Sequence, residues 1–139
     1  MSSCPLCTAH GETVLWQDSS CRVVLVDDPD YPGYCRVIWQ AHAKEMTELT
    51  ASERSHFMDV VFAAEAVLCE LLQPDKINLA SLGNQTPHLH WHVIPRYRKD
   101  VNFPNPIWSA RLRDATPPAA PAIQLLRQRF SARLDPAPA

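Results

Sequence analysis

Residues 84–97 read Asn-Gln-Thr-Pro-His-Leu-His-Trp-His-Val-Ile-Pro-Arg-Tyr and hold three of the six histidines in the chain. Successive side chains of a β-strand point to opposite faces, so residues two apart share a face. The alternation therefore predicts a strand over residues 88–94, with a histidine face and an apolar core face. The histidine face consists of His88, His90 and His92, and the core face consists of Leu89, Trp91 and Val93.

The segments on either side predict the other strands of a sheet. Short apolar segments between polar turns predict strands at residues 13–16, 22–26, 34–39 and 77–82. The first three are expected to pair as an antiparallel meander, because their connections are too short for crossover helices.

One long helix and a proline-rich C-terminal part complete the pattern. Thr50-Ala-Ser-Glu53 fits a capping box, and the three-and-four apolar spacing that follows predicts a core-facing helix ending at Pro74. A short helix is expected from Pro121, and a disordered tail from about residue 134. Trp108 is expected to pack in the core or in a dimer, with a nucleotide base as the alternative contact.

Composition limits the classes of protein that the chain can belong to. The chain has 139 residues, and we expect a single domain over residues 1–139. The formal net charge of −2 argues against nucleic-acid binding. The three glycines, Gly11, Gly33 and Gly83, lie too far apart for a Walker loop or a dinucleotide fingerprint.

The chain shows no sign of a membrane or secretory destination. No segment is apolar and long enough to span a membrane, and the start of the chain lacks a secretory signal. The five cysteines are an odd number without a framework pattern, so disulfides are not expected. We therefore expect a cytoplasmic protein.

Three interpretations of the histidine face are open. It is a polar strand surface, or a catalytic metal site, or the site of nucleophilic catalysis. His-x-His on a strand can hold zinc or iron, but no carboxylate follows until Asp100, which weakens the metal interpretation. A neutral imidazole with a pKa of about 6.5 is a competent nucleophile toward phosphorus at neutral pH.

The stretch from Asn84 to Tyr97 resembles the signature of the histidine-triad (HIT) superfamily, His-x-His-x-His followed by apolar residues. Val37-Ile-Trp-Gln-Ala-His42 is similar to another strand of that family. The order of Cys4-x-x-Cys7, the long helix and the triad also fits. The resemblance covers residue 4 to about 97 and points most closely to small bacterial HIT hydrolases of the diadenosine tetraphosphate type.

The resemblance implies a fold and an assembly. The fold is α+β, with a mainly antiparallel sheet of about five strands and the long helix packed on it. HIT proteins usually pair as homodimers through that helix and a sheet edge. The partners implied are a nucleotide substrate, with a purine base, and a second copy of the chain, but neither a membrane nor a nucleic acid.

The resemblance also implies a two-step reaction without a catalytic cofactor. His90 attacks the α-phosphorus of a nucleotide to give a nucleotidyl-histidine, which water or another acceptor then releases. A backbone carbonyl on the other ring nitrogen would fix the tautomer of His90. His88 and His92 would contact phosphate oxygens, and His92 would help to protonate the leaving group.

Nucleotide contacts are implied at two further places. Asp27, at the end of a predicted strand, corresponds to the family's ribose-binding acid, with Asp28 as a rival and turn capping as the alternative for both. Asn84 and Thr86, on either side of Gln85, lie in the turn where the family places phosphate-binding groups. The usual glycine-glutamine of the family is replaced in this turn.

The pair Cys4-x-x-Cys7 has its own set of interpretations. A redox pair should follow a strand, and none precedes it here. Some bacterial HIT proteins hold a structural zinc ion through such a pair and two histidines, which correspond here to His42 and His88. The result is a closed Cys2His2 tetrahedron. His10 is the alternative third ligand, and two reduced cysteines without metal remain the other possibility.

The sequence therefore predicts a nucleotide hydrolase or nucleotidyltransferase. Its substrate would be a nucleoside monophosphate joined to a leaving group, as in dinucleoside polyphosphates or nucleoside phosphoramidates. A nucleotide-binding regulatory module with little turnover is the alternative. An enzyme that uses a metal ion bound by the three histidines is a second one.

Overall fold

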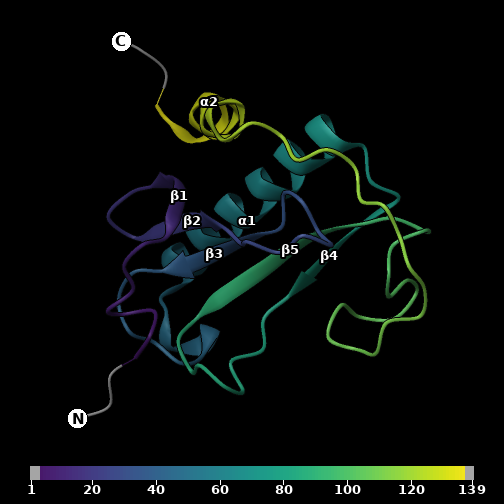
Figure 1. Cartoon of the computed structure of the whole chain (residues 1–139). Helices are drawn as coiled ribbons and strands as arrows, with labels where there is room; N and C mark the ends of the chain where they lie inside the picture. Colours follow the sequence, from purple (N-terminus) through teal and green to yellow (C-terminus); the bar gives the residue numbers. More distant parts are fainter. Residues whose placement is uncertain (1–3, 137–139) are drawn as a thin grey trace.

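The computed structural model describes residues 4–136, and its centre is a five-stranded sheet in the order β1-β2-β3-β5-β4. All neighbouring strands run antiparallel (Figure 1). The strands are β1 (Thr13–Gln17), β2 (Cys21–Leu25), β3 (Cys35–Trp39), β4 (Lys76–Ala80) and β5 (His90–Arg96). The predicted sheet, its meander and the α+β class are confirmed.

The long helix α1 (Ala51–Leu72) covers one face of the sheet, and α2 (Ile123–Leu134) lies against α1 and β1 (Figure 1). Thr50 and Glu53 each accept a hydrogen bond from the other's backbone N–H, so the predicted capping box begins α1. A short 3-10 helix, η1 (Met46–Glu48), precedes it. The predicted core-facing stripe of α1 is buried as far as Leu68, whereas Leu71 and Leu72 in its last turn are only half-buried. The buried residues are Phe57, Val60, Val61, Ala63, Ala64, Val67 and Leu68.

The two faces of the sheet have different surroundings. Side chains that point toward α1 form the apolar core, with Val23, Val37 and Val93 fully buried. The opposite face carries polar side chains, because His92 lies opposite Arg36 across β5 and β3. This second face holds the candidate site.

The prediction that a strand begins at His88 is wrong by two residues. The N–H of His88 bonds to the Thr86 carbonyl in a tight turn after Pro87, and Leu89 bonds to Ala43. Regular pairing starts only at His90. His88 therefore does not share the strand face of the other two histidines, although Leu89 still reaches the core.

No helix in the described part of the chain, residues 4–136, is long and apolar enough to cross a membrane. The predicted tail falls partly on residues 137–139, which lie outside the described residues. Before them, the Asp135 carboxylate accepts a hydrogen bond of 2.8 Å from the indole N–H of Trp16.

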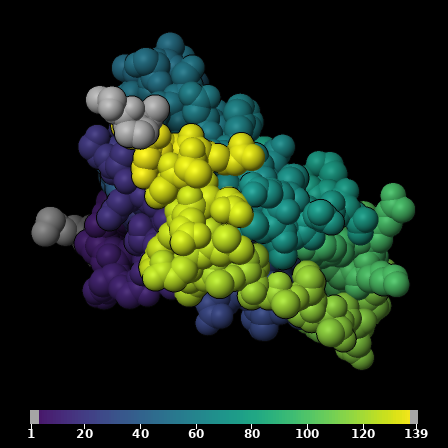
Figure 2. All heavy atoms as spheres, turned by 90° about the horizontal axis from the view of Figure 1, so that it is seen from above, coloured from purple at the N-terminus to yellow at the C-terminus, as the bar shows by residue number. Residues whose placement is uncertain are grey.

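The C-terminal part after β5 is irregular as far as α2, and Figure 2 shows it as a green to yellow-green band that leads to the yellow α2. A buried ion pair anchors its start. Arg96 is 2% exposed and donates to both carboxylate oxygens of Asp100, at 2.9 and 3.1 Å. Burial would raise the pKa of Asp100, but Arg96 and backbone N–H donors lower it to about 2.

Asp100→Asn is expected to destabilise the protein at pH 7 by about 3 kcal/mol, because it leaves the buried Arg96 unpaired. A carboxylate whose pKa is lowered on folding stabilises above its unfolded pKa of about 4 and loses that contribution as pH falls toward 2. The difference from wild type should therefore shrink between pH 4 and pH 2. Urea unfolding at pH 7 and pH 2.5 measures both values.

Glu70→Gln is the matched control, because it breaks an exposed pair with Arg129 in which both side chains are over 40% exposed. We expect a cost below about 1 kcal/mol for it. Equal destabilisation by Asp100→Asn at both pH values would contradict the assignment to an ion pair.

Candidate functional site

His90 and His92 open onto a cavity of about 370 Å³ on the sheet face away from α1. Arg36 on β3 and the turn between β4 and β5 form two of its other walls. The described lining residues include no aspartate or glutamate, so the cavity suits an anion. They are Leu6, Arg36, Leu82, Gly83, Asn84, Gln85, Thr86, His90, His92 and Trp108.

The tautomer of His90 follows from one hydrogen bond. Its Nδ1 lies 2.6 Å from the backbone carbonyl oxygen of His88. A carbonyl oxygen only accepts, so Nδ1 carries the proton and Nε2 keeps its lone pair. His90 is 8% exposed, and this free nitrogen is available for attack on an electrophile in the cavity.

His92 is held by the buried Tyr34, whose hydroxyl oxygen lies 2.6 Å from Nδ1. Burial raises the pKa of Tyr34, against a lowering by Arg36, so the hydroxyl keeps its proton. The guanidinium of Arg36, which also approaches this hydroxyl oxygen, can only donate to it. The hydroxyl therefore directs its own proton to Nδ1, which leaves the ring proton of His92 on Nε2.

His92 is a neutral hydrogen-bond donor. Burial, together with the neighbouring His90 and Arg36, lowers its pKa to about 4. The rings of His90 and His92 lie 4.9 Å apart, and Trp108, which is 52% exposed, has its ring 5.0 Å from His92. Trp108 is therefore a wall of the cavity and not a core residue.

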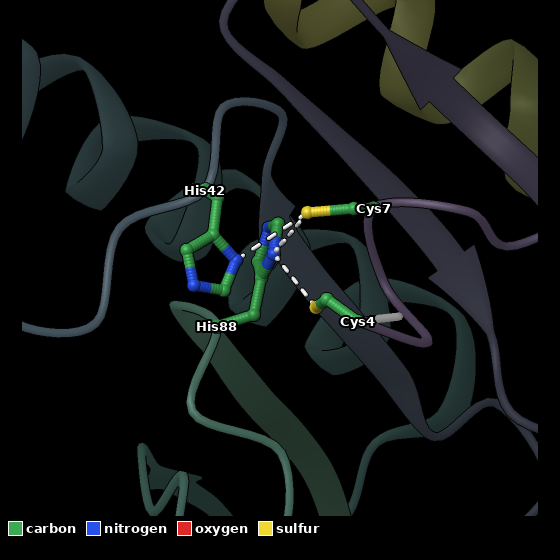
Figure 3. Close-up of side chains that lie close together, drawn as sticks. All are labelled: Cys4, Cys7, His42 and His88. Atoms are coloured by element: carbon green, nitrogen blue, oxygen red, sulfur yellow. Dashed lines mark hydrogen bonds between the residues drawn. The ribbon is translucent and has the colours of Figure 1, made fainter. Parts of the chain in front are cut away.

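His88 turns away from this cavity, and both of its ring nitrogens have partners. Nε2 lies 2.6 Å from the Trp39 carbonyl oxygen and must donate to it. Nδ1 then presents its lone pair to the sulfurs of Cys4 and Cys7, each 3.4 Å away (Figure 3). The phosphate contact expected of His88 finds no free ring nitrogen.

Cys4, Cys7, His42 and His88 converge in one cluster, with ligand atoms all within 4.8 Å of one another (Figure 3). The Nδ1 of His42 lies 3.4 Å from the Cys7 sulfur. Sulfur and nitrogen ligands of a tetrahedral zinc ion are about 3.5 Å apart, so the spacing fits that metal. The carbonyl of Trp39 holds the His88 ring as such a ligand requires. His10 is not a member of this cluster.

Asp27 lines a second cavity of about 710 Å³, next to the ends of β1 and β2. Its carboxylate is exposed, and no hydrogen bond or salt bridge within residues 4–136 uses it. Asp28, in contrast, accepts a hydrogen bond from the Asp30 N–H and so caps the turn. Arg36 lines both this cavity and the histidine cavity.

Sequence reasoning missed two residues of the site, Tyr34 and Arg36. A charged residue inside the otherwise apolar segment Cys35-Arg-Val-Ile-Trp39 was the signal for Arg36. Nothing in the sequence indicated a role for Tyr34, because a tyrosine at the start of a predicted strand is typical of a core residue.

The family model described as HIT domain matches residues 9–99. Among curated proteins, an AP-4-A phosphorylase of Mycobacterium tuberculosis (strain H37Rv) is 30% identical over 81 residues. That match covers 54% of this chain and 42% of the relative, so the chain spans less than half of its length.

Solved structures with the same fold are also known. The histidine triad protein blr8122 from Bradyrhizobium japonicum is 25% identical, with a TM-score of 0.72 and coverage of 86% of this chain and 90% of that one. A histidine triad (HIT) protein from Sinorhizobium meliloti 1021 is 27% identical, with a TM-score of 0.70 and coverage of 88% and 90%. A Zn-bound histidine triad family protein from Mycobacterium smegmatis is 22% identical over 91% of this chain and 89% of that one, with a TM-score of 0.65, and shares the fold.

Proposed function

Because the chain belongs to the HIT domain family, we propose that it is a nucleotide hydrolase or nucleotidyltransferase with His90 as its nucleophile. The observation that carries the proposal is the hydrogen bond from His90 Nδ1 to the His88 carbonyl. It leaves Nε2 unprotonated toward a cavity whose described lining residues include no aspartate or glutamate. Phosphorus in a nucleotide is the electrophile that such a nitrogen and such a cavity suit.

The reaction has two displacements at the α-phosphorus. In the first, Nε2 of His90 forms a bond to phosphorus and the bond from phosphorus to the leaving group breaks. In the second, water attacks phosphorus, the bond to His90 breaks, and the proton of the water passes to solvent. His92 donates a hydrogen bond from Nε2 to an oxygen of the departing group.

A neutral His92 favours leaving groups that depart as anions. Its low pKa means that at pH 7 the ring is neutral, so it lacks the second proton that an imidazolium would transfer to a leaving group. A polyphosphate leaves as a stable anion, whereas an amine from a phosphoramidate needs a proton. The proposal therefore ranks dinucleoside polyphosphates first, as the AP-4-A phosphorylase relative also suggests.

The nucleoside is assigned to the second cavity. Asp27 would accept hydrogen bonds from the ribose hydroxyls, since its carboxylate is exposed there and unused among the described residues. Asn84 and Thr86, in the wall of the histidine cavity, would hold phosphate oxygens. A purine is the expected base.

Zinc is proposed as a structural ion on Cys4, Cys7, His42 and His88. Four protein ligands close a tetrahedron and leave no position for water, so the ion would bind the start of the chain to the turn before β5. Catalysis itself is assigned to protein side chains alone.

A homodimer and a cytoplasmic location complete the proposal. β4 is an edge strand of the sheet, and Phe62 on α1 is 53% exposed, so both surfaces named by the resemblance are available. The free thiols of all five cysteines suit a reducing compartment. One domain over residues 1–139 remains our assignment.

The covalent adduct is the direct test. The protein is mixed with diadenosine tetraphosphate or an activated adenylate, quenched in mild alkali, and digested for peptide mass spectrometry. We expect an adenylyl group on the peptide that contains residues 88–92. Nucleotide binding without turnover and without adduct would favour the regulatory module instead.

Tyr34→Phe is expected to lower kcat about 10-fold, because His92 loses the donor that fixes its proton on Nε2. The ¹⁵N chemical shifts of the imidazole should show a mixture of tautomers at His92. Tyr97→Phe is the control, since its hydroxyl makes only a 3.5 Å contact with the Leu72 carbonyl and lies in another cavity. An unchanged tautomer in Tyr34→Phe would contradict the positioning role.

A further inference from the structure

Arg36 is unlike the two other arginines that lie in strands. Arg22 donates to Glu12, to Gln40 and to a backbone carbonyl. Arg96 is satisfied in the same way by Asp100, Asn78 and a carbonyl. The Nε of Arg36 is buried without any hydrogen-bond partner, and no carboxylate within residues 4–136 pairs with its guanidinium. A buried N–H donor without an acceptor costs free energy of folding. We therefore expect the Nε of Arg36 to donate to a molecule from outside the chain.

The position of Arg36 says which kind of partner that is. It lies opposite His92 in the register of β3 and β5, so both side chains leave the same face of the sheet. Among the described residues, Arg36 is the only one that lines both the histidine cavity and the Asp27 cavity. A ligand that occupies both cavities would therefore lie next to this side chain.

The site also lacks another source of positive charge. The ring of His88 is committed to Trp39 and to the cysteines, and His92 has its Nδ1 occupied by Tyr34. Arg36 is the only lysine or arginine among the described residues that line the histidine cavity. Phosphoryl groups need cationic donors on their oxygens, and most of all in the transition state.

We infer that Arg36 binds the α-phosphate oxygens of the nucleotide, between a nucleoside in the Asp27 cavity and the leaving group beside His92. This inference rests on the proposed function for the identity of the ligand. The guanidinium would supply the charge that the flanking histidines do not. Its Cζ lies over the Tyr34 ring, 6.0 Å from the ring centre, and its planar fork suits two oxygens at once.

The test compares ligands with and without the phosphate. Affinities for AMP and adenosine are measured by calorimetry on wild type, Arg36→Gln and Arg36→Lys, and on Arg98→Gln as the control. Arg98 is exposed and lies in a different cavity, so its replacement makes the same change of charge away from the histidines. Thermal unfolding of each variant verifies the fold.

In Arg36→Gln we expect AMP to bind about 10- to 100-fold more weakly, with the affinity for adenosine unchanged. Arg36→Lys should recover part of the loss, because it restores the charge but not the fork. Equal affinity of wild type and Arg36→Gln for AMP would overturn the inference, as would an equal loss for AMP and adenosine.

The same measurements separate this inference from the proposed function. An AMP-specific loss in Arg36→Gln together with no adduct in wild type would uphold Arg36 as a phosphate-binding residue and reject His90 as a nucleophile. An adduct on His90 that forms at the same rate in Arg36→Gln would uphold His90 as the nucleophile and reject Arg36 as a phosphate-binding residue. Binding of neither AMP nor adenosine to wild type would overturn both.

Discussion

His90→Ala is expected to reduce kcat about 10⁴-fold or more and to abolish the nucleotidyl adduct. The substitution removes the nitrogen that we propose as the attacking atom, and loss of a nucleophile typically has effects of this size or greater. Substrate binding should change little, since Arg36 and Asp27 remain. Single-turnover kinetics with diadenosine tetraphosphate, followed by release of AMP, measures the change.

His56→Ala is the matched control for that experiment. His56 lies on α1, where it pairs with Asp18 at 2.7 Å, and it does not line the histidine cavity. The kcat of His56→Ala should stay within about twofold of the wild-type value. Turnover by His90→Ala within tenfold of wild type would reject the nucleophile and leave direct attack by water.

Activity in the presence of a chelator distinguishes the metal-dependent alternative from nucleophilic catalysis by His90. If His90 and His92 held a catalytic ion, activity should vanish with a chelator and return with added metal. With His90 as a nucleophile, activity should persist for as long as the protein stays folded. Circular dichroism of the chelated sample verifies that the fold remains.

The second large effect is expected from the cysteine and histidine cluster. Protein purified without chelator should contain about one zinc ion per chain, and Cys4→Ser/Cys7→Ser should contain none. With free zinc about 1,000-fold above its dissociation constant, the bound ion stabilises the folded state by about 4 kcal/mol. The double variant should therefore unfold about 10 °C lower than wild type.

Cys69→Ser is the control for the cluster. This cysteine is exposed on α1 and belongs to no group of ligands among the described residues, so zinc content and unfolding temperature should stay as in wild type. His42→Ala and His10→Ala distinguish the two candidate third ligands, and only His42→Ala should lower zinc affinity. Wild-type protein without zinc would reject the site.

The fold was predictable because its signals are local. Alternation of apolar residues gave the strands, and the Thr50–Glu53 capping box gave the start of α1. The triad motif then supplied the topology by resemblance. The predicted start of β5 was wrong, because an alternating pattern cannot reveal that the His88 N–H bonds back to the Thr86 carbonyl.

The candidate site was predictable only where one short stretch holds it. Asn84, Thr86 and His90 lie in one short stretch, and all three line the histidine cavity. The roles of Tyr34 and Arg36 depend on strand register, which brings residues 58 positions apart into a hydrogen bond between Tyr34 and His92. Arg96 shows the same limit. It lies at the end of β5, yet Asp100, four residues later, pairs with it in the interior.

The backbone and the side chain of His88 make two separate contacts. Its backbone carbonyl orients the ring of His90, whereas its imidazole faces the cysteines. Any amino acid at position 88 would present a carbonyl, so the first contact places no demand on the side chain. A lineage that lost Cys4 and Cys7 would therefore be free to vary the side chain at this position without losing the orientation of His90. In terms of sequence drift, the first histidine of the triad is tied to the N-terminal segment more closely than to the chemistry.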